Sequence, residues 1–415
     1  MSEHIKVKKL IMVEGENPKT GAQNNKFYNM VENSDNTFSV EYGRIGATSA
    51  FKTYGMNKWN STLNSKLRKG YIDNTELFLE KEEKSNFKEI EESRISRIVA
   101  ELQRFANASI SENYIVGSGS VTQKQVARVQ ELINDLVEHV SSLESKREKP
   151  IEEINKTLLE VFRVIPRRMS DVRRHLLSDE NQPKEDLIKR INSIIDNEQK
   201  TLDVMESQVK VSEVENDNQT ILETMEIDIF DVNQEDISMI KKMLGRCSNQ
   251  FVEAFMVINK KTQKKFDDYV EGSSNKKRKL FFHGSRNENW FSIINNGLVL
   301  RPSNAVITGK YFGYGIYGAD RAKKSIGYTS LTGSYWARGR SNVGFMSLFN
   351  FHLGNMLQID YSNDWMGRLT KERLKKRGDY DSVFAKKNNN FLYNNEYIVY
   401  DEAQCTIRFL VKLKG

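Results

Sequence analysis

Between residues 80 and 210 the chain almost lacks glycine, and its apolar residues recur at intervals of three and four positions. This spacing lines apolar side chains along one face of an α-helix, which predicts amphipathic helices with a buried face. The apolar runs cover 129–143, 151–162 and 187–195. Prolines that would interrupt a helix stand between or at the ends of these runs: Pro150, Pro166 and Pro183. The sequence therefore predicts an all-α bundle with the apolar stripes as its core.

The segments that flank this bundle have β character. Residues 1–75 alternate short apolar runs with turn signals such as NSDN and GATS, which predicts antiparallel strands. A helix is expected to follow and to end near Gly70. The polar stretch 211–220 predicts a linker, and β patterns rich in aromatic residues and glycine return from about residue 221. The predicted fold class is α+β multidomain, with a small antiparallel β domain, an all-α bundle and a domain built on a mixed β-sheet.

Composition narrows the possible functions. A net charge of +7 and a pI near 9.0 permit contacts with nucleic-acid phosphates without requiring them. No apolar run approaches the roughly 18–20 residues of a membrane span, so no membrane partner is expected. The first residues, MSEHIKVKKL, lack the apolar core of a secretory signal. Cys247 and Cys405 have no metal-site spacing, which predicts a reducing compartment and neither a zinc finger nor another metal site.

The stretch FLYNNEYIVYDEAQ, residues 391–404, combines a predicted buried strand with a carboxylate. Tyr397 to Tyr400 are β-branched or aromatic residues, and Glu396 stands at the head of the strand. An ionised carboxylate is costly to bury unless another group pairs with it. Glu396 therefore either lies at a solvated strand end, which the strand pattern alone favours, or has a function.

A second stretch, KLFFHGSRNENWFSIINNGL at 279–298, predicts a strand that ends in His283-Gly284-Ser285 and is followed by a helix. Gly284 would let a ligand approach the backbone closely. A lone histidine at a strand end is more often structural than functional, so His283 by itself leaves both interpretations open.

A third stretch, TGKYFGYGIYGADRAKKSIGYT at 308–329, contains the spacing G-x-G-x-x-G at Gly313, Gly315 and Gly318. This spacing marks a dinucleotide site only when a strand precedes it, a helix follows it and both belong to a parallel βαβ unit. Here the glycines alternate with aromatic residues and the surrounding pattern is not βαβ. We therefore reject the Rossmann interpretation.

Together, the motifs HGSR, GIYGAD…KKSIGYT and LYNNEYIVYD resemble the catalytic domain of the poly(ADP-ribose) polymerases, the H-Y-E class of ADP-ribosyltransferases. Order and spacing agree over roughly 180 residues, which is far more specific than any one short motif. Residues 1–80 resemble a WGR domain, with Tyr42-Gly43-Arg44 as the signature, and 88–212 resemble the family's helical regulatory domain. The catalytic domain falls on 221–415, and the chain is similar to the smaller, DNA-dependent members without zinc fingers.

The resemblance implies NAD⁺ as the substrate, with cleavage of the bond between nicotinamide and ribose through an oxocarbenium-like transition state. The catalytic set it implies is His283, Tyr317 and Glu396, in which Glu396 polarises the ribose and offsets its developing charge. His283 and Ser285 would bind the adenine-side ribose, and Asn289 would assist them.

The remaining implied contacts concern nicotinamide. The Gly284 backbone and the Ser325 hydroxyl would hold the carboxamide, and Tyr317 and Tyr328 would enclose the cationic ring. Core packing is the alternative for both tyrosines. Lys324 would act on the acceptor side, and a solvated lysine is the alternative.

For DNA binding, residues 1–75 hold 11 Lys and Arg against 7 Asp and Glu. The candidate contacts to DNA are Arg44, Trp59, Lys66, Arg68 and Lys69. For Trp59, packing of a helix on the sheet is the favoured alternative. The implied partners are DNA strand breaks, acceptor proteins including the chain itself, and an accessory factor that sets the acceptor residue. DNA binding would relieve shielding of the NAD⁺ site by the helical domain.

The intact His, Tyr and Glu set is associated in this family with polymer formation. Two departures leave chain length and branching open: Gly318 replaces an aromatic residue, and 370–390 is shorter and more basic than the family's acceptor-side loop. A mono-ADP-ribosyltransferase and a non-catalytic DNA-end-binding scaffold are the alternatives. NKKRKL at 275–280 is either a nuclear import signal or a surface loop. The expected location is nuclear in a eukaryote and otherwise cytoplasmic.

Overall fold

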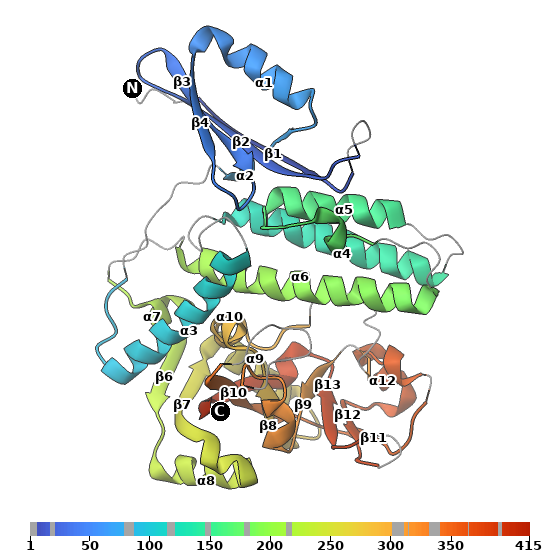
Figure 1. Cartoon of the computed structure of the whole chain (residues 1–415). Helices are drawn as coiled ribbons and strands as arrows, with labels where there is room; N and C mark the ends of the chain where they lie inside the picture. Colours follow the sequence, from blue (N-terminus) through green and yellow to red (C-terminus); the bar gives the residue numbers. More distant parts are fainter. Residues whose placement is uncertain are drawn as a thin grey trace. The chain divides into compact units, whose positions relative to one another are not determined.

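The chain forms two units, and each is described by itself (Figure 1). The computed structural model describes residues 6–16, 21–78, 87–113, 121–145, 151–177, 183–212, 218–300, 311–313, 315–331, 341–363, 365–388 and 392–415. The first unit combines Met1–Glu83 with Ser109–Val209, and the second combines Lys84–Ala108 with Lys210–Gly415. The grouping joins the predicted N-terminal β domain to most of the predicted bundle. The boundaries at 80, 88, 212 and 221 stay predictions.

The first unit begins with an antiparallel sheet in the order β4-β3-β2-β1-β5. Its strands are β1 (Val7–Glu14), β2 (Asn24–Glu32), β3 (Thr37–Arg44), β4 (Ala50–Gly55) and β5 (Ile72–Asp73). The turn η1 (Met56–Lys58) leads into α1 (Trp59–Leu67), which packs through Trp59 on a core that includes Phe38 and Val40. Gly70 follows with φ +93°, a left-handed conformation that suits glycine. The predicted meander and helix are confirmed.

Long helices complete the first unit. They are α4 (Gln123–Ser145), α5 (Ile151–Val164), α6 (Lys184–Ser212) as far as Val209, and the last residues of α3 (Ser93–Asn113), together with the short α2 (Thr75–Phe78) and η2 (Val172–His175). The apolar stripes are buried, as Ile133 and Leu136 show at 0% exposure. Pro183 directly precedes α6 and Pro166 follows α5, whereas Pro150 lies outside the described residues. The predicted helices and their core are confirmed.

The second unit contains two sheets. One is antiparallel, in the order β6-β7-β14-β10-β8, and the other is mixed, in the order β11-β12-β13-β9. The first uses β6 (Ile227–Asp231), β7 (Phe251–Asn259), β14 (Cys405–Lys414), β10 (Val343–His352) and β8 (Arg278–Gly284). The second uses β11 (Met356–Ile359), β12 (Ser382–Ala385), β13 (Glu396–Val399) and β9 (Ile316–Gly318). Reciprocal backbone bonds of 2.9 and 3.0 Å between Phe282 and Ala319 join them where β8 meets the end of β9.

Helices of the second unit flank these sheets. They are α7 (Ile221–Met225), α8 (Gln234–Leu244), α9 (Lys260–Gly272), α10 (Trp290–Asn296), α11 (Ala322–Ile326) and α12 (Lys371–Gly378). The 3₁₀ turns are η3 (Gly245–Gln250), η4 (Asn287–Asn289), η5 (Met366–Arg368) and η6 (Glu402–Gln404). The predicted linker at 211–220 is narrower than expected, because α6 continues to Ser212 and Thr220 caps α7; residues 213–217 lie outside the described part. The mixed α+β fold class is confirmed.

The glycines at 313, 315 and 318 serve packing and do not form a dinucleotide turn. β9 pairs antiparallel with β13, so the spacing does not belong to a parallel βαβ unit. A Cβ on Gly313 would lie 2.3 Å from the carbonyl oxygen of Leu369, and one on Gly315 would lie 2.3 Å from Cγ2 of Ile398. The rejection of the Rossmann interpretation is confirmed.

The described residues include no helix that is long and apolar enough to cross a bilayer. In the same ranges, no three His, Cys, Asp or Glu side chains come together in a group that could hold a metal ion.

Candidate active site

The histidine and tyrosine motifs meet where the two sheets join. His283 lies at the end of β8, where pairing with Ser347 of β10 positions it. Its Nδ1 lies 3.3 Å from the carbonyl oxygen of Tyr317 on β9. A ring nitrogen facing a carbonyl oxygen carries the proton, so this contact orients the half-buried imidazole. Two motifs that are 34 residues apart in the sequence therefore form one local arrangement.

Gly284 is required by the protein itself. A Cβ built on it would lie 1.9 Å from the carbonyl oxygen of Ser325, which is in α11. Close approach at Gly284 was predicted for a ligand, but the group that approaches here is the backbone of α11. The contact places the buried Ser325 directly beside the strand end that carries His283.

The turn after β8 holds Ser285 and Asn289 together. The Asn289 amide donates a hydrogen bond of 2.9 Å to the Ser285 hydroxyl, and the indole of Trp290 donates one of 3.2 Å to the Ser285 carbonyl. Trp290 is fully buried and anchors the turn in the core. Both predicted ribose contacts are thus half-buried side chains on one firmly held turn.

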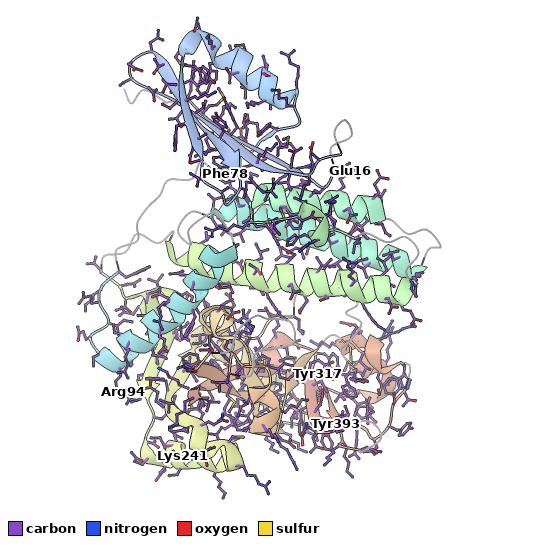
Figure 2. All side chains as sticks on the ribbon, viewed as in Figure 1. Glu16, Phe78, Arg94, Lys241, Tyr317 and Tyr393 are labelled. Atoms are coloured by element: carbon purple, nitrogen blue, oxygen red, sulfur yellow. The ribbon has the colours of Figure 1, made fainter. Side chains whose placement is uncertain are left out.

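Tyr317 is positioned through its hydroxyl. The hydroxyl donates a hydrogen bond of 2.9 Å to the carbonyl of Gly313 and accepts one of 3.2 Å from the backbone amide of Phe312 (Figure 2 labels Tyr317). Burial raises the pKa of Tyr317 far above its ordinary value, and the charge of Glu396 raises it further. The phenol is therefore neutral and takes part in holding the 312–313 turn, so part of its role is structural.

Tyr328 differs from Tyr317 because it is 61% exposed. Core packing, the alternative for this residue, is wrong. Partial burial raises the pKa of Tyr328, and the charge of Glu396 raises it as well. Tyr317, Tyr328 and Glu396 consequently lie within electrostatic reach of one another.

Glu396 is the first residue of β13 and forms an ion pair of 2.5 Å with Lys324 of α11. The two side chains are 17% and 16% exposed, so neither is solvated in the manner of a surface residue. Both solvated alternatives, for Glu396 and for Lys324, are wrong. The pair connects β13 to the same short helix that carries Ser325.

One further contact escaped the sequence analysis. The Asn395 amide donates 2.8 Å to the carboxylate of Asp320, which ties the residue before Glu396 to the end of β9. Asp320 is the last residue of the motif GIYGAD and Asn395 directly precedes the glutamate in LYNNEYIVYD, so their place in these motifs was the available signal. This bond helps to fix the distance between Tyr317 and Glu396.

The candidate DNA residues of the first unit divide into two groups, of which the first makes internal contacts. The Arg44 guanidinium donates hydrogen bonds of 3.0 and 2.8 Å to the carbonyls of Met169 and Ser170. Trp59 is 7% exposed, and its ring meets Phe38 edge to face at 5.1 Å. These contacts hold the sheet together and attach it to the segment after α5.

The second group belongs to a basic surface. The Lys66 ammonium lies 3.9 Å from the ring centre of Tyr28. Burial lowers the pKa of Lys66, and the nearby charges of Lys69, Lys26 and Lys52 lower it further. The sequence analysis did not single out Lys26 or Lys52, which come from β2 and β4. Arg68 and Lys69 are exposed, and Arg68 bonds the carbonyl of Asn64 at 3.3 Å.

Comparison with known proteins agrees with this geometry. Residues 234–415 match the poly(ADP-ribose) polymerase catalytic domain. The uncharacterized protein 101L of Invertebrate iridescent virus 6 is 33% identical over 202 residues, which cover 49% of this chain and 77% of that protein. The putative poly [ADP-ribose] polymerase-like 100L of the same virus is 29% identical over 181 residues, 43% of this chain and 93% of that protein.

Cellular polymerases match over a smaller share of their length. Poly [ADP-ribose] polymerase 2 of Arabidopsis thaliana is 31% identical over 169 residues, which cover 36% of this chain and 26% of that enzyme. Residues 234–415 therefore form a poly(ADP-ribose) polymerase catalytic domain, and the chain is an NAD⁺ ADP-ribosyltransferase.

Proposed function

We propose that this enzyme builds poly(ADP-ribose) on proteins, itself included, and that Glu396 acts directly on the substrate ribose. The observation that carries the proposal is the Lys324–Glu396 pair, which lies within electrostatic reach of Tyr317 and Tyr328. A half-buried carboxylate of this kind can accept a hydrogen bond from a ribose hydroxyl. It also offsets positive charge as nicotinamide leaves.

The other residues bind and orient NAD⁺ in this proposal. The Gly284 backbone and the Ser325 hydroxyl hold the carboxamide, while the exposed face of Tyr328 covers the cationic ring. His283 and Ser285 bind the adenine-side ribose. The His283–Tyr317 contact supports this division, since it leaves the imidazole oriented as a hydrogen-bonding anchor rather than a general base.

The test is transfer from labelled NAD⁺ by the full chain and by Glu396→Gln. Loss of a preorganised charge costs about 3–4 kcal/mol, which corresponds to a decrease in turnover of about 10²–10³-fold. Glu271→Gln, an exposed glutamate at the end of α9, is the matched control and should keep full activity. A ladder of products indicates a polymer, and a single band would instead identify a mono-ADP-ribosyltransferase. Wild-type turnover by Glu396→Gln would contradict the assigned role.

We further propose that DNA strand breaks stimulate the enzyme through the first unit. The basic surface around Lys66, Lys69, Lys26 and Lys52 supports this, because clustered cations bind phosphates. Exposed Arg68 is part of the same proposal, whereas Arg44 and Trp59 are occupied by internal contacts. Nicked DNA should raise turnover of the full chain, and Lys26→Gln/Lys52→Gln should reduce the stimulation. Equal turnover with and without nicked DNA would refute it.

The cellular setting follows the same proposal. A nuclear location is proposed for a eukaryotic host and a cytoplasmic one otherwise, with an accessory factor that selects the acceptor residue. The exposure of residues 276–279 in NKKRKL supports a nuclear import signal. Arg278 and Lys279 are also the first residues of β8, so the signal would overlap the start of this strand. A fluorescent fusion with Lys276→Gln/Lys277→Gln tests the import signal, and unchanged localisation would refute it.

A further inference from the structure

A hollow of about 580 Å³ lies between η5 and α12, and none of the residues that line it is assigned to NAD⁺. Its lining consists of four basic and two apolar residues: Trp365, Arg368, Leu369, Arg373, Lys376 and Arg377. We call this the η5–α12 pocket. Its volume lies in the range of sites that take a small organic ligand, roughly 300–1,000 Å³.

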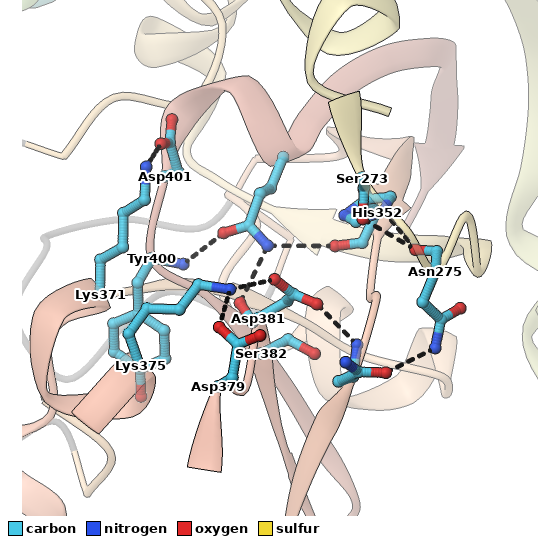
Figure 3. A network of polar contacts seen from close by, with 12 residues as sticks. Ser273, Asn275, His352, Lys371, Lys375, Asp379, Asp381, Ser382, Tyr400 and Asp401 are labelled. Carbon is cyan, nitrogen blue, oxygen red and sulfur yellow. Dashed lines mark hydrogen bonds and ion pairs between the residues drawn. The ribbon is translucent and has the colours of Figure 1, made fainter. Parts of the chain in front are cut away.

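The helix α12 has two basic faces with different roles. Lys371 and Lys375, four residues apart, face carboxylates of two turns, one between α12 and β12 and the other after β13 (Figure 3). Lys375 lies 2.8 Å from Asp381 and 3.0 Å from Asp379, and Lys371 pairs with Asp401. These pairs anchor the helix and satisfy that face.

The other face of α12 carries cations that the anchoring network does not use. Arg373, Lys376 and Arg377 have the spacing i, i+3, i+4 and therefore point to one side of the helix. All three are exposed, as is Arg368. Within the described residues no carboxylate lines the pocket, while Asp364 lies outside them. The adjacent Glu372 instead accepts a bond of 2.8 Å from the Thr370 hydroxyl.

Two contacts hold the pocket in shape. The guanidinium of Arg377 lies 3.7 Å from the ring centre of Trp365, and the Arg373 guanidinium donates 2.7 Å to the carbonyl of Arg368. Trp365 itself packs against the buried core of the mixed sheet. Stacking and a backbone bond place the planar guanidinium groups before any ligand arrives, which suits forked recognition of phosphate oxygens.

We propose that the η5–α12 pocket binds a pyrophosphate group carried by a small ligand. Four cations gathered around one hollow match a compact multivalent anion. A DNA duplex would instead need cations spread along an extended backbone. The pocket also adjoins the tyrosine motif, because Leu369 abuts Gly313, whose carbonyl accepts the Tyr317 hydroxyl. Two sources of pyrophosphate are compatible with this chemistry: a free nucleoside diphosphate, and the ADP-ribosyl group that the enzyme transfers.

Titration of the full chain with inorganic pyrophosphate tests the proposal by calorimetry. Arg368→Gln/Lys376→Gln should weaken binding about tenfold or more, since each charge-assisted bond contributes strongly. Arg246→Gln/Lys242→Gln removes the same residue types from exposed positions on η3 and α8, and it should bind like the wild type. Trp365→Phe should remove the fluorescence change that accompanies binding. Equal weakening in both double variants, or the absence of saturable binding, would overturn the proposal.

Further titrations identify the ligand. Adenosine should not bind the pocket, while ADP and ADP-ribose should both show a component that is lost in Arg368→Gln/Lys376→Gln. If ADP and ADP-ribose bind the pocket with equal affinity, the pocket recognises the pyrophosphate itself. If ADP-ribose binds more tightly than ADP, the pocket recognises the transferred ADP-ribosyl group. A short DNA duplex that displaces pyrophosphate more effectively than ADP would replace the proposal with a nucleic-acid surface. Unchanged melting temperatures of the variants verify that each one is folded.

Discussion

Replacing Gly284 by alanine tests whether the contact between β8 and α11 sets the geometry of the site. The added Cβ would lie 1.9 Å from the carbonyl oxygen of Ser325 and 2.7 Å from its carbonyl carbon. Carbon and carbonyl oxygen approach each other to about 3.3 Å without strain, so the two backbones must separate by about 1.4 Å. Neither neighbour is a flexible side chain tip, and the whole of α11 must therefore move.

That movement affects both ends of the site. Because α11 carries Ser325 and Lys324, a shift of this size displaces the partner of Glu396 as well as the proposed carboxamide contact. A misplacement of about 1 Å can cost about 10²-fold in rate, so kcat/KM for NAD⁺ should decrease by at least about that factor. Overpacking should also lower the free energy of unfolding by about 1–3 kcal/mol.

The assay is release of nicotinamide by the full chain, measured with thermal unfolding of the same samples. Gly272→Ala is the matched control, because a Cβ there meets no atom within 4 Å. It should retain wild-type turnover and stability to within about 0.5 kcal/mol. If Gly284→Ala keeps kcat/KM within about threefold of wild type while folded, the close approach of α11 does not position the site, and the reasoning fails.

Three other predictions concern stability and reactivity. Burial, and after it the neighbouring tyrosines, raises the pKa of Tyr28 to about 12. The free energy of unfolding of the first unit should therefore stay constant below pH 10 and decrease towards pH 12. In denaturant melts at alkaline pH, Tyr28→Phe should make this decrease smaller. Burial raises the pKa of the Cys405 thiol, so a thiol reagent at pH 8 should label only Cys247 in the native chain. Prompt labelling of both cysteines would contradict the buried placement of Cys405. Trp59→Ala should destabilise the first unit by about 3–5 kcal/mol, and a DNA-binding defect without such a loss in denaturant melts would instead make Trp59 a contact residue.

Periodicity explains why so much of the fold could be predicted. Helical spacing identified α4, α5 and α6, since one buried stripe leaves the same pattern in any bundle. The short runs that became β8 and β13 were recognisable because β-branched and aromatic residues adjoin polar motif residues, at the end of β8 and at the start of β13. The candidate site was found by its motifs, each of which is contiguous in the sequence.

Contacts between distant residues could not be predicted from the sequence. Residues 84–108 group with the second unit, where Arg94 pairs with Asp231 at 2.8 Å and Lys412 with Glu101 at 2.7 Å. The last pair spans 311 residues, and neither local spacing nor propensity records it. Gly284 shows the same limit, because the partner that demands glycine there lies in a helix 41 positions later.

The placement of Glu396 shows how the second unit tolerates a carboxylate beside a buried strand. Ile398 and Val399, two and three residues further along the strand, are fully buried, so an unpaired charge at this strand head would be costly. Lys324 supplies a cation from the protein at 2.5 Å, and stability therefore does not depend on a cationic substrate. The ion pair with Lys324 also holds the carboxylate in one orientation. The same pair thus reconciles a stable sheet with a charge positioned for reaction.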